Sequence, residues 1–102
     1  MRLYRLVIVL SFLLVSLNVN SQTNEDDINS LSIFSEYVKA KNYDAAYEPW
    51  MELRERNPKF NSAIFVYGER ILKYKIKNSS DEEKINYIND LGNLWNEKRI
   101  NF

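Results

Sequence analysis

The side chains of this 102-residue sequence that could take part in chemistry are carboxylates, lysines, tyrosines and serines, because His and Cys are both absent. Their absence removes the commonest general base, the thiolate nucleophile, disulfide bonds and the usual zinc ligands. Two carboxylates about 5–9.5 Å apart in one cleft could still hydrolyse a glycosidic bond. The candidates fall on predicted polar helix faces, and four short helices offer no foreseeable cleft; they are Glu48, Glu52, Glu55 and Glu69. The sequence therefore predicts a protein that is not an enzyme.

Two runs of acidic residues have simpler explanations than a metal site. Glu25, Asp26 and Asp27 belong to a polar stretch over residues 22–28 that has no apolar periodicity. We expect this stretch to be a disordered lead-in, whose adjacent carboxylates are merely solvated. The run Ser80-Asp81-Glu82-Glu83 is a capping box, in which Ser80 caps a helix and the carboxylates lie in its first turn. We therefore expect neither a metal ion nor a cofactor.

The N-terminal segment, residues 1–21, has the pattern of a cleavable signal peptide. Arg2 and Arg5 precede an uncharged apolar run of 12 residues over positions 6–17, and Ser21 supplies a small residue at the predicted cleavage site. The alternatives are an uncleaved membrane anchor and a buried helix. At 1.5 Å per residue the run spans only about 18 Å, against a hydrocarbon core of about 30 Å. We therefore expect export across the inner membrane, with a mature protein in the periplasm or outside the cell.

Composition favours one small globular domain. Apolar residues make up 45% of the chain and charged residues 27%, with only two Gly and two Pro. Removing Arg2 and Arg5 from the 14 basic residues leaves 12 against 14 acidic residues, a net charge of about −2. Such a balance provides no basic excess for nucleic acid. After cleavage of the leader we expect a released protein that is not tethered to a membrane.

Apolar periodicity predicts four helices in the mature chain, over about residues 28–41, 43–56, 61–77 and 80–98. Asn29 or Ser30 could cap the first and Asp44 the second, Pro49 should kink or fray the second, and Pro58 should end it. The third helix has two apolar stripes, which implies contacts on two sides. The residues expected in the core are Tyr37, Trp50, Leu53, Ile64, Tyr67, Ile71 and Ile88. The predicted fold is all-α, with two antiparallel helical hairpins over residues 29–102.

An internal repeat relates the two hairpins. A shift of 34 residues places Tyr37 on Ile71 and Lys39 on Lys73, and a shift of 38 places Trp50 on Ile88. In this respect the chain resembles the tetratricopeptide repeat: Tyr43-Asp44-Ala45-Ala46, Trp50, Asn57-Pro58 and Tyr67-Gly68 occupy positions of the family pattern. Phe34, Leu53 and Lys84 depart from it, each standing where a small residue is usual. A generic four-helix bundle is the alternative.

A narrower resemblance is to the N-terminal part of exported tetratricopeptide-repeat proteins of Bacteroidetes-type bacteria. It is carried by the stretches over residues 32–36, 39–50 and 67–73. Those relatives continue for several more repeats, and two repeats without a polar cap are marginal as a solenoid. We therefore expect either a fragment of a longer repeat protein or a short form that needs a partner.

The family resemblance implies a scaffold that binds a protein or peptide through the first helix of each hairpin. Carried onto this chain, the expected peptide-binding residues are Lys39, Phe65, Glu69, Leu72 and Lys73. Phe65 and Leu72 would supply apolar contacts in a shallow groove, and the two lysines would receive an acidic group of an extended ligand. The alternative is a structural subunit that oligomerises through its aromatic surface, or that packs against further repeats of its own chain.

Overall fold

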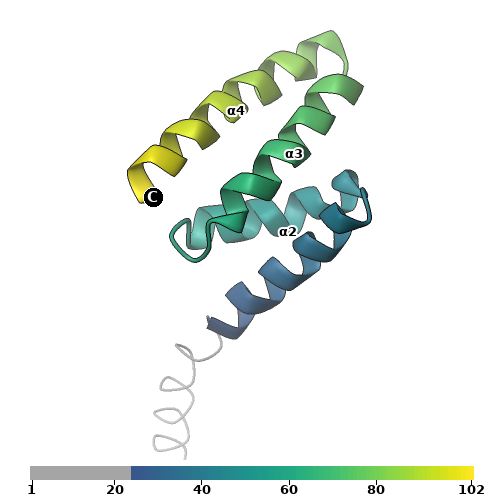
Figure 1. Cartoon of the computed structure of the whole chain (residues 1–102). Helices are drawn as coiled ribbons and strands as arrows, with labels where there is room; N and C mark the ends of the chain where they lie inside the picture. Colours follow the sequence, from purple (N-terminus) through teal and green to yellow (C-terminus); the bar gives the residue numbers. More distant parts are fainter. Residues whose placement is uncertain (1–23) are drawn as a thin grey trace, which may run out of the picture.

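The computed structural model describes residues 24–102, and this part of the chain is all helical. A helix over residues 24–39, called here the first helix, is followed by α2 (Tyr43–Arg56), α3 (Ala63–Asn78) and α4 (Asp81–Asn101) (Figure 1). The expected all-α class is therefore confirmed for these residues. The predicted signal peptide lies outside the described residues.

The first helix begins earlier than the sequence predicted. Residues 24–28, expected to be disordered, form its first turn, and Asn29 and Ser30 lie inside the helix instead of capping it. Asp27 is almost fully buried. Its carboxylate accepts hydrogen bonds from Arg56 Nε (2.5 Å) and Asn57 Nδ2 (3.2 Å) at the end of α2. An opposite charge and an amide donor offset the desolvation of a buried carboxylate. The acidic composition of this stretch suggested a solvated tail, whereas the contact of Asp27 with Arg56 holds the start of the first helix against α2.

A left-handed residue ends the first helix. Lys41 has φ 60°, the Lys41 N–H donates to the Val38 carbonyl (2.9 Å), and the Asn42 N–H donates to the Tyr37 carbonyl (2.8 Å). These two bonds form a Schellman motif, which confirms the predicted break at Lys41-Asn42. The cap of α2 is Asn42, whose side chain accepts from the Ala45 N–H, so the prediction of Asp44 as the cap is wrong.

The other helix ends follow their sequence signals closely. Helix α2 has the predicted bounds and continues through Pro49 without fraying in its first turn, and Asn57 ends it. Helix α4 begins after Ser80, whose hydroxyl accepts from the Glu83 N–H, so the predicted cap is confirmed. Its end at Asn101 lies beyond the predicted end at residue 98.

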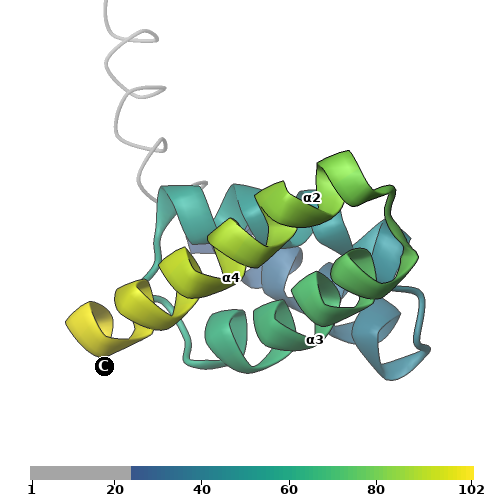
Figure 2. The same ribbon diagram turned by 90° about the horizontal axis from the view of Figure 1, so that it is seen from above.

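Helix α3 is central to the packing, because α2 and α4 both lie against it. Helices α3 and α4 run side by side when the molecule is seen from above (Figure 2). Trp50 of α2 is fully buried, and its indole N–H donates to the Ile64 carbonyl of α3 (2.7 Å). A Cβ at Gly68 would overlap the Trp50 ring, so this glycine permits the close approach of α2 and α3.

The predicted core is right in part. Trp50, Leu53, Ile64 and Ile71 are fully buried, and Tyr67 is partly buried, with its ring edge-to-face with Phe34 of the first helix. Two predictions are wrong, since Tyr37 and Ile88 are exposed. Other side chains of the same two helices fill the core in their place; they include Phe34, Val38, Leu91 and Leu94. The apolar periodicity was thus recognised correctly, but in two helices the wrong side of it was assigned to the core.

Candidate functional site

Two of the five predicted peptide-binding residues belong to the core. Phe65 and Leu72 are buried, so the expectation that they supply exposed apolar contacts is wrong. The ring of Phe65 meets that of Phe102 edge-to-face, with 5.5 Å between the ring centroids. Phe102 reaches Phe65 because α4 continues past Lys98, the residue at which the sequence analysis ended this helix. The prediction that Phe65 is exposed therefore missed this contact with the end of α4.

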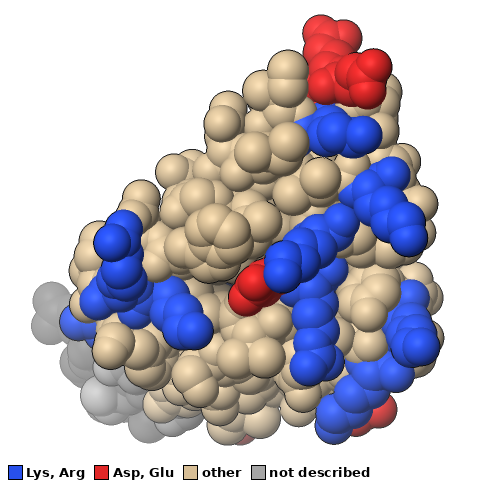
Figure 3. All heavy atoms as spheres, turned by 45° about the horizontal axis from the view of Figure 1, so that its top comes forward, with Lys and Arg blue, Asp and Glu red and all other residues tan. Residues whose placement is uncertain are grey.

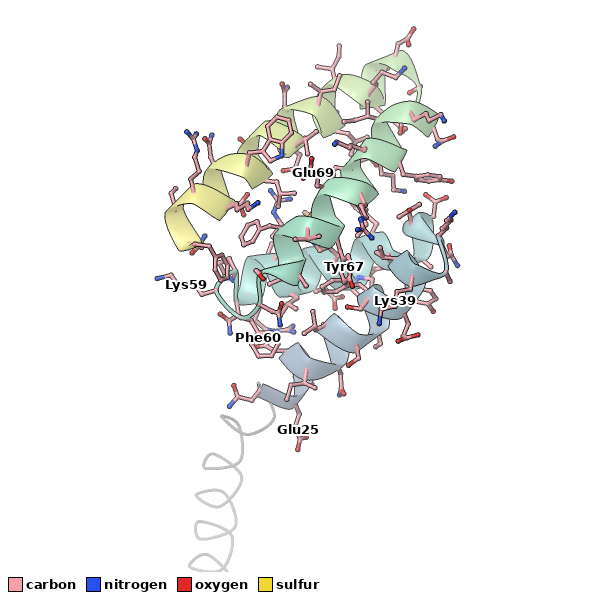
Figure 4. All side chains as sticks on the ribbon, viewed as in Figure 1. Glu25, Lys39, Lys59, Phe60, Tyr67 and Glu69 are labelled. Carbon is pink, nitrogen blue, oxygen red and sulfur yellow. The ribbon has the colours of Figure 1, made fainter. Side chains whose placement is uncertain are left out.

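Of the three charged residues of the predicted groove, Lys39 and Lys73 are exposed and Glu69 is partly buried, and they are divided between two places. Lys39, on the first helix, lies 3.8 Å from Glu36. Glu69 accepts from Lys73 within α3 (2.9 Å), and this hydrogen bond lowers the pKa of Glu69. Figure 4 shows Tyr67 on the side of α3 next to the first helix and Glu69 on the side next to α4. Lys39 and the Glu69–Lys73 pair therefore do not form one groove.

A different set of residues forms a continuous exposed row along α3. Val66, Arg70, Lys73 and Lys77 are all exposed and follow one another at intervals of four, three and four residues, so they share one face of the helix. We call this row the basic stripe. Lys and Arg side chains gather over α3 in Figure 3. Of the four residues of this stripe, only Lys73 was among the predicted binding residues. The resemblance had indicated apolar contacts at Phe65 and Leu72 instead.

Tyr67 contacts one cation of the basic stripe, Arg70. The Arg70 guanidinium lies 5.6 Å from the centroid of the Tyr67 ring, within the range of a cation–π contact. This contact orients the cation without neutralising it, since an aromatic ring carries no net charge. Arg70 therefore remains available to an anionic group, whereas the Lys73 ammonium is already shared with Glu69.

A shallow cavity of about 480 Å³ lies between α2 and α4, and its chemistry is dominated by one buried cation. Arg54 donates to both oxygens of Asp90 (2.8 and 2.9 Å) and to both oxygens of Glu97 (3.1 and 2.5 Å). Burial opposes the charged form of Arg54, but hydrogen bonds from its guanidinium to these two carboxylates outweigh that effect and raise its pKa. All three charged groups are thus engaged with one another. We interpret this cluster as a structural tie between α2 and α4.

The described residues offer little else on which chemistry could be based. Across residues 24–102, no group of three or more acidic side chains is placed to hold a metal ion. None of the helices in this region is both long and apolar enough to cross a membrane. No family model, curated protein or solved structure matches the chain. Its function is therefore argued from its surfaces.

Proposed function

We propose that this chain is an exported, non-enzymatic scaffold that binds an acidic segment of a protein or peptide through the basic stripe of α3. The scaffold would be tetratricopeptide-like, with the first helix and α2 as one antiparallel hairpin and α3 and α4 as the other. Its cellular place would be the periplasm or the exterior, as the leader pattern predicts. The observation that carries the binding proposal is the exposed row of Val66, Arg70, Lys73 and Lys77 on one helix face.

The contact between Trp50 and Gly68 supports the repeat-like arrangement. In the resemblance, Trp50 takes the large apolar place of the first unit, and Gly68 is the glycine of the Leu-Gly pair in the first helix of the second unit. The Trp50 ring lies where a Cβ at Gly68 would be, and its N–H is satisfied by the Ile64 carbonyl. A large ring seated against a glycine brings two helix axes close together. This is the kind of interface on which consecutive repeat units are stacked.

The composition of the basic stripe suggests its ligand class. Three cations spaced along about two helical turns would attract a segment that carries several carboxylates. Val66, about half exposed at one end of the row, would receive an apolar side chain of the same segment. The chain as a whole has no net positive charge, so the attraction is local to this face. An acidic peptide with one or two apolar residues is therefore the ligand that fits.

A designed peptide tests this proposal without knowledge of the natural partner. The probe is a fluorescein-labelled peptide rich in Glu and Asp with interspersed Leu, and its binding is followed by fluorescence anisotropy. Joint replacement of Arg70 and Lys73 by Glu should weaken binding by about tenfold or more, which corresponds to about 1.4 kcal/mol. Raising the salt concentration should weaken binding to the unmodified chain, because exposed charges are screened.

Lys59→Glu provides the control for Arg70→Glu alone, because these two single substitutions change the net charge by the same amount. Lys59 is an exposed cation in the loop before α3, and Figure 4 shows it pointing away from that helix. Its reversal changes the net charge but leaves the basic stripe intact. Helicity should be unchanged in all variants, since exposed charges contribute little to stability. An equal loss of affinity from Lys59→Glu would contradict the proposal, because binding would then follow total charge and not the stripe.

A further inference from the structure

Helix α4 carries an apolar row that the rest of the described chain covers only in part. Ile85, Ile88 and Trp95 are about half exposed or more, and Gly92 lies between them in the same row. Their intervals of three, four and three residues are those of a coiled-coil seam. We call these four residues the α4 seam. Figure 3 shows an uncharged surface over α4, beside the basic residues of α3.

The α4 seam is separate from the face with which α4 joins the core. Leu91 and Leu94 are buried against the rest of the molecule and satisfy the packing of α4 on α3. Ile88 and Trp95 lie on another side of the same helix and remain about half exposed. A contiguous exposed apolar row on a small domain indicates an interaction surface.

Gly92 has no packing role within residues 24–102, the part of the chain that the structure describes. It lies near the middle of the 21-residue α4, where glycine costs about 1 kcal/mol relative to alanine. A Cβ at this position would meet nothing within 4 Å, in contrast to Gly68, where it would overlap Trp50. The absence of a side chain at Gly92 therefore leaves space on the outer surface only. Such a gap lets a second helix approach closely.

The charges of α4 indicate that this second helix is another copy of α4. Its first turn is acidic, with Asp81, Glu82 and Glu83, and its last turn is basic, with Lys98 and Arg99. Two copies in antiparallel orientation bring the acidic start of each beside the basic end of the other, and their helix dipoles also oppose favourably. A parallel pair would place like charges together. We propose that two copies of the chain associate through the α4 seam in antiparallel orientation and cross at Gly92.

This arrangement makes the apolar residues complementary as well. Ile88 precedes Gly92 by four residues and Trp95 follows it by three, so crossing at Gly92 brings Ile88 of each copy opposite Trp95 of the partner subunit. The two glycines meet on the two-fold axis, where no side chain separates the helices. Ile88 and Trp95 of each copy then face an apolar counterpart, and Ile85 faces Arg99 of the partner subunit, with each contact made twice as in an isologous interface. The α4 seam adjoins the basic stripe, because Trp95 lies near Glu69, the ion-pair partner of Lys73, so separate variants are needed to distinguish the two proposals.

Solution mass tests the association. Sedimentation velocity of the full chain over a range of concentrations should show a monomer–dimer equilibrium. Ile88→Glu should weaken dimerisation at least tenfold, because two carboxylates would then enter the interface. Ile33→Glu is the matched control: Ile33 is 48% exposed and Ile88 50%, but Ile33 lies on the first helix. A chain that stays monomeric at about 100 µM would overturn the proposal, and so would equal effects of the two substitutions.

Single cysteines test the orientation, because the sequence contains none of its own. Gly92→Cys should give a disulfide-linked dimer on mild oxidation, since the two positions meet on the proposed axis and no neighbour obstructs a Cβ there. Ile85→Cys alone should not, because Ile85 lies two turns away from the crossing. A mixture of Ile85→Cys and Arg99→Cys chains should crosslink to each other. Efficient crosslinking of Ile85→Cys with itself would show a parallel pair and refute the antiparallel arrangement. Peptide binding by Ile88→Glu, measured separately, tests the basic stripe alone.

Discussion

Replacing Arg54 by Met tests whether the charged cluster between α2 and α4 contributes to stability as a buried or as a surface ion pair. Arg54 is only 5% exposed, and its guanidinium makes four hydrogen bonds to the carboxylates of Asp90 and Glu97. The Arg54 guanidinium also lies 5.1 Å from the centroid of the Trp50 ring, so it borders the apolar core. Methionine keeps much of the apolar stem and removes the charge.

The expected cost follows from what the substitution leaves behind. Removing one partner of a fully buried ion pair typically costs about 3–5 kcal/mol, because the remaining charge is desolvated and unpaired. Asp90 is 26% exposed and Glu97 35% exposed, so water can solvate part of both carboxylates once Arg54 is gone. We therefore expect a loss of about 2–3 kcal/mol, below the fully buried range but above the 0–1 kcal/mol of an exposed pair. That loss is a large part of the stability of a small domain.

Urea unfolding followed by circular dichroism at 222 nm measures this loss. Arg70→Met is the control, since Arg70 is exposed and its cation–π contact is worth about 0.5–1 kcal/mol. Adding Asp90→Asn and Glu97→Gln to Arg54→Met should recover most of the loss, because no unpaired charge then remains. A loss below about 1 kcal/mol for Arg54→Met would refute the reasoning, since the cluster would then be energetically a surface one.

Four further predictions concern single positions. Gly68→Ala should destabilise the chain by at least about 2 kcal/mol in urea unfolding, because the clash with Trp50 outweighs a gain in helix propensity of about 1 kcal/mol; a neutral result would show that the indole can move. Lys41→Gly should stabilise it by about 0.5–1 kcal/mol, because glycine adopts φ 60° without strain. The hydrogen bond from Lys75 lowers the pKa of Asp44 below its ordinary value of 3.8. The stability that this pair contributes is therefore complete above pH 3.8 and is lost as the pH falls through the lower pKa of the folded state. Asp44→Asn should remove this acid-dependent loss from urea unfolding midpoints measured against pH. Intact-mass measurement of protein recovered from its host should show a chain that begins at or next to Gln22, and an intact residue 1 would contradict the signal-peptide prediction.

Helix boundaries were predictable wherever local chemistry determines them. Asn57-Pro58 ends α2 because the residue before a proline is driven out of the helical region, and Ser80 begins α4 because its hydroxyl accepts an otherwise unpaired N–H. The start of the first helix was not predictable in this way. It depends on the pairing of Asp27 with Arg56, which lies 29 residues further along the chain. Composition alone gives no sign of a partner at that distance.

The candidate site was harder to predict because periodicity identifies faces but not their neighbours. On α3 both apolar stripes are buried, one against α2 and the other beneath α4 and Phe102, so no apolar side chain of the predicted groove remained for a ligand. On α4 the sequence placed Ile88 in the core, whereas Leu91 and Leu94 occupy it. The first helix, α3 and α4 each have more apolar residues than their packed faces bury, since Ile33, Val66 and Ile88 stay exposed. Which residues are left outside is decided by the crossing of the helices, and this crossing is a tertiary property.

The two glycines show how structure separates residues that the sequence makes look alike. Both occupy the interior of a long helix, where glycine is unfavourable relative to alanine. At Gly68 the Trp50 ring occupies the space that a side chain would take, so the packing of α2 on α3 requires glycine at this position. At Gly92 nothing within the described chain takes that place. Substitution to alanine should therefore affect the two positions in opposite directions, lowering stability at Gly68 and raising the helical stability of the isolated chain at Gly92. If Gly92→Ala also weakens dimerisation, the function of this glycine lies at the contact between two molecules and not in the fold of one.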